Sequence, residues 1–362
     1  MARPGEHSFR LPALVLLVSL LLFARRPDLI LRPQFVWEEP SAFWAAAIVD
    51  WPALLTPWVG FPQLFPRLTY AAASVGPPAI APAVIILAHW LLIAAVAVFL
   101  ASDTMADAIP GRWTRFAIAV ALPLLGSEVV GTGLDAQWYL AVLLVALALA
   151  RPRRWHVLAA IVAGLSGPAS IVLWPLFWRR PGLGAVVACC GAIQLAVFLS
   201  SPRPPSPVDL SSVPGMLIPV AAIAILAAWR SSVPRRTIIA FGWAAAATAA
   251  GGALTLGPAF GRSGILGLAL GDGSRYMLVA EVGLLVLVAA GIAARRRPAV
   301  VAGGLIVALS IIGFRQPPWP DMAWASHADC IGSATTCVVP VFPAEWSVEW
   351  FPGYRPPTTV PG

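Results

Sequence analysis

The sequence has very little charge for its length. Of its 362 residues, 11% are Asp, Glu, Lys or Arg and 59% are hydrophobic, and the mean hydropathy is +0.82. A soluble domain carries charge on roughly a quarter of its residues. Most of the surface must therefore face lipid, which excludes a soluble globular protein and indicates a membrane protein.

Lysine is absent, so all 24 basic residues are arginines. The formal net charge of +8 does not indicate nucleic acid binding, because the arginines gather in short clusters between apolar runs. This distribution is typical of the cytoplasmic loops of a membrane protein. Also missing are a P-loop, a GxGxxG turn between a strand and a helix, and an internal repeat of the kind found in transporters built from two halves.

Apolar runs of about 17–25 residues, the length that a helix needs to cross a bilayer, recur along the chain. We predict an all-α fold, a polytopic membrane bundle of about eleven transmembrane helices within residues 1–314. A small outer tail follows at 315–362. The predicted helices lie near residues 11–24, 81–101, 113–128, 138–150, 156–178 (two short helices), 183–199, up to 229, 237–254, 276–293 and up to 314.

Arginine clusters set the orientation of this bundle. The clusters at 151–154, 179–180, 230–236 and 295–297 all fall on one side of the membrane in the predicted arrangement. The positive-inside rule therefore places the N-terminus in the cytoplasm and the C-terminus outside.

One apolar stretch is interrupted by the motif LSGP (165–168). Pro168 removes a backbone donor and clashes with the preceding helical turn. We expect a hairpin of two short helices here, because a broken helix is tolerated at membrane depth only where it packs against protein or lines a cavity.

The segment 35–67 is long, aromatic and acidic, unlike a short polar connector between two helices. It belongs to a predicted outer loop at 25–80 and holds the only adjacent acids of the chain, Glu38 and Glu39. Aromatic neighbours such as Trp37 favour partial burial of the loop, and a carboxylate with apolar neighbours has the raised proton affinity that suits a general base. The alternative is that both acids are solvated loop charges.

Arg67 and Arg275 each lie where an outer loop meets a helix, and Tyr276 follows the second. The planar fork of arginine suits phosphate, so these side chains are candidates for holding a lipid-linked phosphate. The alternative is that both arginines, and Tyr276, anchor the protein in the headgroup region of the membrane.

Glu281 lies inside the predicted tenth helix, where a carboxylate is costly and needs a partner, which we expect on another helix. A structural ion pair and a site role both stay open for it. His89 is interpreted as a packed histidine, and Glu128 and Asp135 as exposed charges beside a turn. The four histidines are scattered, and the sequence contains no metal motif.

Two pairs of cysteines have different interpretations. Cys330 and Cys337 lie seven residues apart in the predicted outer tail, which is an oxidising compartment, and we predict a disulfide between them. Cys189 and Cys190 are adjacent within a predicted helix and are interpreted as small, inert apolar residues.

Spaced motifs give the chain a resemblance to a known group. Trp37 and the two acids precede the pattern PW-x-G-F-x-x-L-x-P-R-L at 57–68. Further motifs are DAQWYL (135–140), LSGP (165–168), PLFWRR (175–180) and SRY (274–276), with two cysteines and Trp346 in the tail. This order resembles bacterial multi-pass proteins of the GT-C glycosyltransferase type, which carry an aromatic residue with E-D-G and, later, P-Y-x-G-Y and P-R.

The resemblance implies transfer of a sugar from a polyprenyl-phosphate donor to an envelope glycan or lipid acceptor, at the outer face of the bacterial plasma (inner) membrane. It implies Glu39 as general base and Glu38 as its orienting partner. The implied contacts to the donor phosphate and the substrate are Arg67, Arg275, Tyr276, Trp37 and Trp58. No cofactor is specified, and a divalent metal stays open.

The chain departs from the pattern of that group at three positions. Glu replaces Asp at 39, Pro replaces Gly at 40, and Phe replaces Tyr at 61. The longer side chain of Glu39 shifts the reactive oxygen, and active sites are sensitive to such shifts.

Two other functions fit the same sequence. The first is a protein that binds or translocates a lipid-linked saccharide on this scaffold without chemistry. The second is a transporter coupled through Glu281, which would show ion-dependent uptake in vesicles. Glu39 separates the first from the enzyme, because replacing it by Gln keeps the shape and removes the base.

Overall fold

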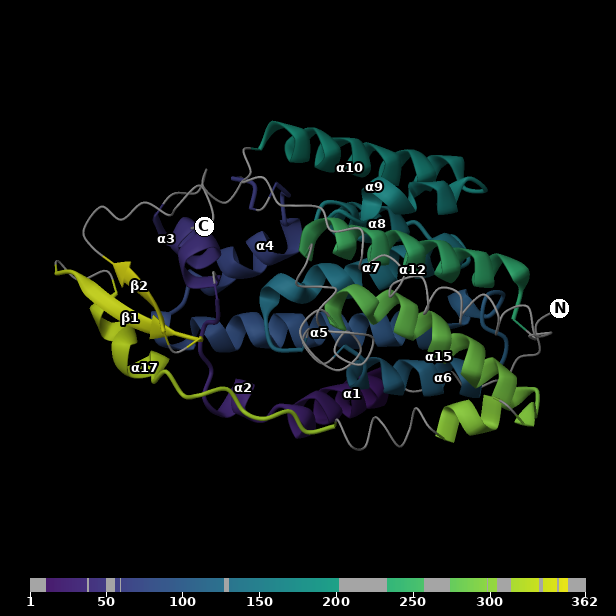
Figure 1. Cartoon of the computed structure of the whole chain (residues 1–362), viewed down its shortest axis with the longest axis horizontal. Coiled ribbons are helices and arrows are strands. Elements are labelled where there is room, and N and C mark those ends of the chain that lie inside the picture. Colours follow the sequence, from purple (N-terminus) through teal and green to yellow (C-terminus); the bar gives the residue numbers. More distant parts are fainter. Residues whose placement is uncertain are drawn as a thin grey trace.

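Helices make up most of the described chain and run side by side in an elongated bundle, with a two-stranded sheet at one end (Figure 1). This computed structural model describes residues 11–37, 39–49, 56–58, 60–126, 130–201, 233–256, 274–297, 299–304, 314–331, 335–343 and 345–350.

The centre of the bundle is α5 (Ala81–Ala101), which packs against helices on several sides. Its sequence is apolar around its whole circumference, as expected of a helix surrounded by protein and lipid. The other long elements are α1 (Leu11–Arg25), α7 (Ala136–Leu149), α10 (Pro181–Ser200), α12 (Arg235–Leu256) and α15 (Leu278–Ala293).

Shorter elements lie between these helices in the sequence, and some of them build the end of the bundle that carries the sheet. They are α2 (Asp28–Leu31), the π-helix η1 (Glu39–Trp44), α3 (Ala45–Val49), α4 (Leu64–Ala73), α6 (Arg112–Ala121), α8 (His156–Gly164), α9 (Ala169–Leu173) and α17 (Trp324–His327). The strands β1 (Cys337–Val341) and β2 (Trp346–Trp350) pair antiparallel, with Cys337 opposite Trp350.

Among the described residues, three helices are long and apolar enough to cross a membrane: Pro78–Ala101, Pro181–Ser200 and Arg275–Ala293. The predicted helical class and the membrane-spanning character of the chain are consistent with these helices, but the prediction of eleven spans is not confirmed. The predicted spans that end at 229 and at 314 fall largely outside the described residues.

The predicted helix 113–128 is shorter in the structure. Its helical part, α6, ends at Ala121, and a 3₁₀ turn at Leu122–Leu124 follows. Pro123 explains the change, since proline lacks the amide that an α-helix would use there.

The predicted break at LSGP is confirmed. The axes of α8 and the segment Ala169–Phe177 differ by 120°, so the apolar stretch doubles back. The break frees the carbonyl of Gly164, which accepts hydrogen bonds from Ser170 Oγ (2.7 Å) and from Gln194 Nε2 on α10 (3.2 Å). Protein groups thus satisfy the broken backbone, as a break at membrane depth requires.

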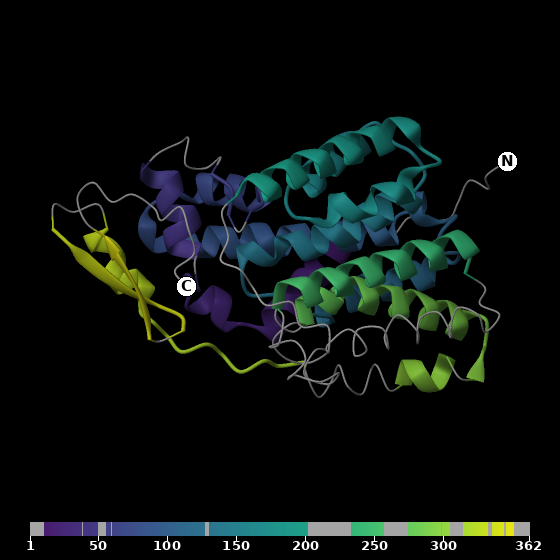
Figure 2. The ribbon, with the colours of Figure 1, turned by 45° about the horizontal axis from the view of Figure 1, so that its top comes forward.

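The C-terminal tail returns to the segment that follows α1 and shares a hydrophobic core with it. Figure 2 shows β1, β2 and α17 beside the purple segment that carries α2 and α3. The Phe35 ring lies 4.6 Å from the Trp324 ring and 5.1 Å from the Trp44 ring, and Trp44 in turn lies 5.5 Å from Trp350. We call this second core the outer cap, because it contains the loop and the tail that the sequence predicts to lie outside. The residues buried in it are Phe35, Ala42, Phe43, Trp44, Ala45, Trp58, Tyr70, Ala73, Ala81, Ile85, Trp324, Cys337, Val339, Val341, Val348 and Trp350.

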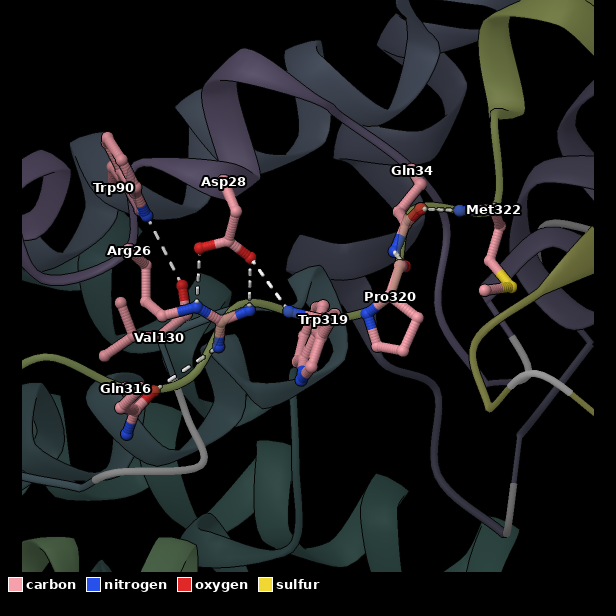
Figure 3. A network of polar contacts seen from close by, with 9 residues as sticks. All are labelled: Arg26, Asp28, Gln34, Trp90, Val130, Gln316, Trp319, Pro320 and Met322. Carbon is pink, nitrogen blue, oxygen red and sulfur yellow. Dashed lines mark hydrogen bonds and ion pairs between the residues drawn. The ribbon is translucent and has the colours of Figure 1, made fainter.

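A buried ion pair joins the tail to the end of α1. Arg26 and Asp28 are bonded in two places, at 3.0 and 2.8 Å, and both side chains are buried. The Trp319 amide donates to Asp28 Oδ2 at 3.3 Å, and the Arg26 guanidinium lies 4.2 Å from the centre of the Trp319 ring (Figure 3). The tail therefore depends on a charge pair that is built from the other end of the sequence.

A second contact continues this attachment towards the cap. Gln34 donates to the Pro320 carbonyl and accepts from the Met322 amide, each at 2.8 Å (Figure 3). A glutamine side chain that uses both its donor and its acceptor in this way fixes the register of the tail against the loop.

We predict that Asp28→Asn lowers the free energy of unfolding by about 3 kcal/mol and exposes the tail to protease, because the Arg26 charge stays buried without its counterion. The matched control is Asp321→Asn, which removes an exposed pair with Arg32 at 3.8 Å and should cost about 0–1 kcal/mol. Thermal unfolding and limited proteolysis in detergent check both, and equal effects of the two variants would contradict the role given to Asp28.

Cys330 and Cys337 are bonded as a disulfide, with Cα atoms 5.8 Å apart. The bond joins the short helix after α17 to β1, and Cys337 is buried in the cap. We predict that mass spectrometry of the unreduced protein finds a peptide linked through these two residues. Two free thiols in freshly purified protein would exclude it.

Candidate active site

Glu39 opens η1, and a tight local turn positions it. The Glu39 amide donates to the Val36 carbonyl at 3.1 Å, and the Val36 amide donates to Glu39 Oε2 at 3.2 Å. Trp37, between them, has φ = +49°, a region that a bulky residue rarely adopts. Its amide donates to the Phe342 carbonyl at 2.7 Å, so the tail holds this strained turn in place.

The Glu39 carboxylate binds groups from two further segments. Tyr70 Oη, on α4, donates to Oε1 at 2.6 Å, and the Gly133 amide, just before α7, donates to the same oxygen at 2.9 Å. A Cβ at position 133 would come within 2.6 Å of Ile85 Cγ2, so the close approach requires glycine. The Glu39 side chain is 3% exposed.

Burial raises the pKa of Glu39 to about 7, although the donors from Tyr70, Val36, Gly133 and the Thr132 hydroxyl lower it in part. Burial and the nearby Glu39 charge together raise the pKa of Tyr70 well above its ordinary value, so its hydroxyl stays a donor. Glu39 thus exchanges a proton near neutral pH beside a neutral phenol, as a general base requires.

Arg67 lies one turn before Tyr70 on α4 but points into the loop. Its guanidinium donates to the carbonyls of Ala42 (3.0 Å) and Thr56 (2.5 Å) and lies 4.4 Å from the centre of the Phe43 ring. Burial lowers its pKa to about 10, so it stays charged. In this conformation Arg67 organises the loop rather than facing a ligand.

The LSGP break supports the start of α4. The Leu64 amide donates to the Leu165 carbonyl at 3.0 Å, and the Phe65 amide donates to Ser166 Oγ at 2.9 Å. The first amides of a helix have no partners within the helix, and this break supplies them. The motifs at 57–68 and 165–168 are therefore in direct contact.

The motif DAQWYL, at the start of α7, contacts LSGP and SRY at the same end of the bundle. PLFWRR instead ends at Arg180, which bonds the Leu147 carbonyl near the other end of α7. Gly167 lies against Gln137, because a Cβ there would come within 2.7 Å of Gln137 Oε1. Tyr276 contacts Trp138 edge to face at 4.7 Å, and the Arg275 guanidinium lies 5.4 Å from the centre of the Tyr276 ring. The structure thus places Arg275 and Tyr276 beside α7.

The predicted aromatic contacts are packed rather than open. Trp58 is 7% exposed and lies edge-on to Phe43 at 6.0 Å, inside the cap. Trp37 packs against Trp319 at 5.9 Å and Phe342 at 6.4 Å. Glu38 and Glu128 lie outside the described residues, and Asp135, predicted to be exposed, is 3% exposed; it follows the turn that binds Glu39.

Two partners of Glu39, Tyr70 and Gly133, escaped the sequence interpretation. Tyr70 is three residues after Arg67, so the two lie on neighbouring turns of one helix. This spacing was the only signal in the sequence that Tyr70 lies close to the candidate site. Gly133 had no local signal, because its role comes from a contact between segments 94 positions apart.

Glu281 has partners from two other elements, as expected. Its Oε2 accepts from the Gly126 amide at 3.0 Å, and its charge interacts with that of Arg25 on α1. Arg25 donates to the carbonyls of Pro123 (2.6 Å) and Leu125 (3.2 Å). Arg25 and Glu281 together bond the free carbonyl and amide groups where the chain stops being helical after α6. This arrangement favours a structural role for Glu281.

His89 is packed, with its ring edge-on to Tyr139 at 5.7 Å, as interpreted from the sequence. The hydrogen bond expected of a packed histidine is not found, since neither ring nitrogen has a partner among the described residues. Within the described ranges, no three His, Cys, Asp or Glu side chains gather in a way that could hold a metal ion. Comparison with known proteins gave no match: no family model, no curated protein and no solved structure is significantly similar to this chain.

The raised pKa of Glu39 predicts a pH-dependent stability. Between pH 4.5 and about 7, the Glu39 carboxyl group keeps a proton in the folded protein that it releases in the unfolded chain. The contribution of Glu39 to the free energy of unfolding therefore falls as the pH rises through this range, and it is constant above it. The loss is about 3 kcal/mol. Thermal unfolding of the wild type and of Glu39→Gln across pH 4–9 checks this, and parallel pH profiles would contradict it.

Proposed function

We propose that this protein is a membrane glycosyltransferase that uses a polyprenyl-phosphate-linked sugar at the outer face of a bacterial plasma membrane, with Glu39 as its general base. The observation that carries the proposal is the Glu39 carboxylate. It is buried, has a pKa of about 7, and is held by donors from Val36, Tyr70 and Gly133. Two of the segments on which the resemblance to the GT-C type rests, the loop that carries Glu39 and the LSGP break, meet at the same end of the bundle through the start of α4.

The proposed step needs one proton acceptor. As the acceptor hydroxyl attacks the anomeric carbon, its proton passes to the Glu39 carboxylate, and the bond from that carbon to the donor phosphate breaks, leaving its electron pair on the phosphate. Near pH 7 a large fraction of Glu39 is ionised and ready to take the proton. The Tyr70 hydroxyl, at 2.6 Å, fixes the orientation of the carboxylate.

A lipid-linked donor also needs a place for its chain. An apolar groove of about 280 Å³ lies between α1 and α5, lined by Ser19, Leu20, Phe23, Ile30, Leu87, Trp90 and Leu91. Trp90 Nε1 donates to the Val130 carbonyl at 3.3 Å, three residues before Gly133. The groove therefore adjoins the segment that binds Glu39, which supports a substrate with an apolar tail.

Access to Glu39 requires movement of the tail. The carboxylate is 3% exposed, and the strained turn at Trp37 is held by the Phe342 carbonyl and packed beneath Trp319. Release of the tail from this turn would relieve the strain and open the loop. In the proposed cycle this release precedes binding of the acceptor, and Arg67 and Arg275 then contact the donor phosphate.

The second candidate is a protein that binds or translocates a lipid-linked saccharide without chemistry. The observation in its favour is that Glu39 and Arg67 are both buried and bonded within the chain. In that case Glu39 holds the outer cap together and takes no proton from a substrate.

We predict that Glu39→Gln lowers sugar transfer about 10²–10⁴-fold, because Gln cannot accept the proton. Glu39→Asp retains activity, since the related pattern carries Asp there. Transfer is measured in membrane vesicles with labelled polyprenyl-phosphate sugars, and in the envelope glycan profile of a deletion strain that expresses each variant.

The matched control is Glu349→Gln, which removes the same charge from an exposed position on β2. It should keep full activity. Normal transfer by a correctly inserted Glu39→Gln protein would remove the catalytic role and favour the second candidate.

A further inference from the structure

The end of the bundle opposite the outer cap gathers arginines from three separate segments. α7 starts beside Glu39, so its last residue marks the far end, which we call the inner end. Arg153 follows α7, Arg180 precedes α10, and Arg236 is the second residue of α12. Arg180 Nη1 donates to the Leu147 carbonyl at 2.7 Å, which joins the second segment to the first. The third is attached by Thr237 Oγ1, which donates to the Ala108 carbonyl at 3.0 Å.

The described acids at the inner end are already paired with other arginines. Asp103 accepts from Arg115 at 2.8 Å. Asp107 binds Arg151 through both oxygens, at 2.8 and 3.0 Å. The charge of Asp107 also interacts with that of Arg236, but at longer range and without a hydrogen bond. In the part of the chain that the structure describes, Arg153, Arg180 and Arg236 form no ion pair.

Two of these arginines, Arg180 and Arg236, also repel each other. Burial and the charge of Arg236 lower the pKa of Arg180, and the charges of Arg180 and Arg153 both act on His156. Like charges held together at a partly buried site are costly unless an anion lies among them.

His156, the first residue of α8, adjoins this cluster, because its amide donates to the Arg153 carbonyl at 3.1 Å. It is 1% exposed, its ring is edge-on to Trp155 at 4.5 Å and to Phe99 at 5.5 Å, and neither ring nitrogen has a hydrogen-bond partner among the described residues. Because the ring is buried, an anion among the arginines is held by the arginines and not by His156.

We propose that Arg153, Arg180 and Arg236, beside His156, form a binding site for a phosphate-bearing anion at the inner end of the bundle. Phosphate suits arginine because its oxygens accept paired hydrogen bonds from the guanidinium fork. The rim carries Trp155 and Trp178, which are 52% and 73% exposed, and the Arg179 guanidinium lies 4.6 Å from the centre of the Trp178 ring. Exposed tryptophans beside arginines are typical of the headgroup level of a membrane. The phosphate therefore comes from a lipid headgroup or from solution.

The test uses the full chain in nanodiscs of phosphatidylcholine, with or without an equal part of phosphatidylglycerol. A third sample contains phosphatidylcholine and inorganic phosphate at constant ionic strength. Bound lipid is counted by native mass spectrometry, and the thermal unfolding midpoint is measured in each sample. Phosphatidylglycerol should bind and raise the midpoint of the wild type.

The main variant is Arg153→Gln with Arg236→Gln, both at exposed positions, so that folding is preserved. Arg180→Gln is added in a second variant. Binding should weaken about tenfold or more in each, because charge-assisted hydrogen bonds to the phosphate are lost. The control is Arg112→Gln with Arg295→Gln, which removes the same charge from exposed positions that neither contact nor act on His156.

Each combination of samples gives a distinct outcome for the proposed anion site. A gain with phosphatidylglycerol alone assigns the site to a lipid headgroup, and a gain with inorganic phosphate as well shows that it accepts the free anion. No gain in the wild type, or equal weakening in the control variant, would overturn the proposal. The experiment does not involve Glu39 or sugar transfer, so its outcome is independent of the proposed function.

Discussion

The outer cap depends on one buried carboxylate. Glu39 accepts hydrogen bonds from Val36 in its own turn, from Tyr70 on α4 and from Gly133 before α7. A buried carboxylate needs several donors, and hydrogen bonds to a charged acceptor are stronger than those to a neutral one. Because they come from three segments, satisfying one charge sets the position of the loop, of α4 and of the start of α7 at once.

The same rule of backbone and charge satisfaction accounts for the irregular parts of the bundle. The LSGP break gives its carbonyls and hydroxyls to the start of α4 and to Gln194, while Arg25 and Glu281 bond the break after α6. Arg26 and Asp28 do the same for the tail. In a low-dielectric bundle each broken segment must find partners in another segment, and this couples regions that are far apart in the sequence.

For the proposed reaction, burial of Glu39 has two opposite consequences. It raises the pKa of the carboxyl group to about 7, which would suit a base at neutral pH, but it also closes the carboxylate to a substrate. The strained turn at Trp37, which the Phe342 carbonyl holds in place, is the part of the loop whose movement would uncover the carboxylate. Strain that surrounding structure holds in place is typical of sites that change conformation during function.

The sequence by itself determined the features that depend on composition or on near neighbours. Low charge and long apolar runs indicated a helical membrane protein, Pro168 predicted the broken helix, and a spacing of seven residues predicted the bond between Cys330 and Cys337. Only the tertiary structure decided what surrounds Glu39. Tyr70 and Gly133 are 31 and 94 positions away, and the contact of Arg67 with the Ala42 carbonyl spans 25 positions. Long-range contacts of this kind leave no local pattern, since each is set by which segments the bundle brings together.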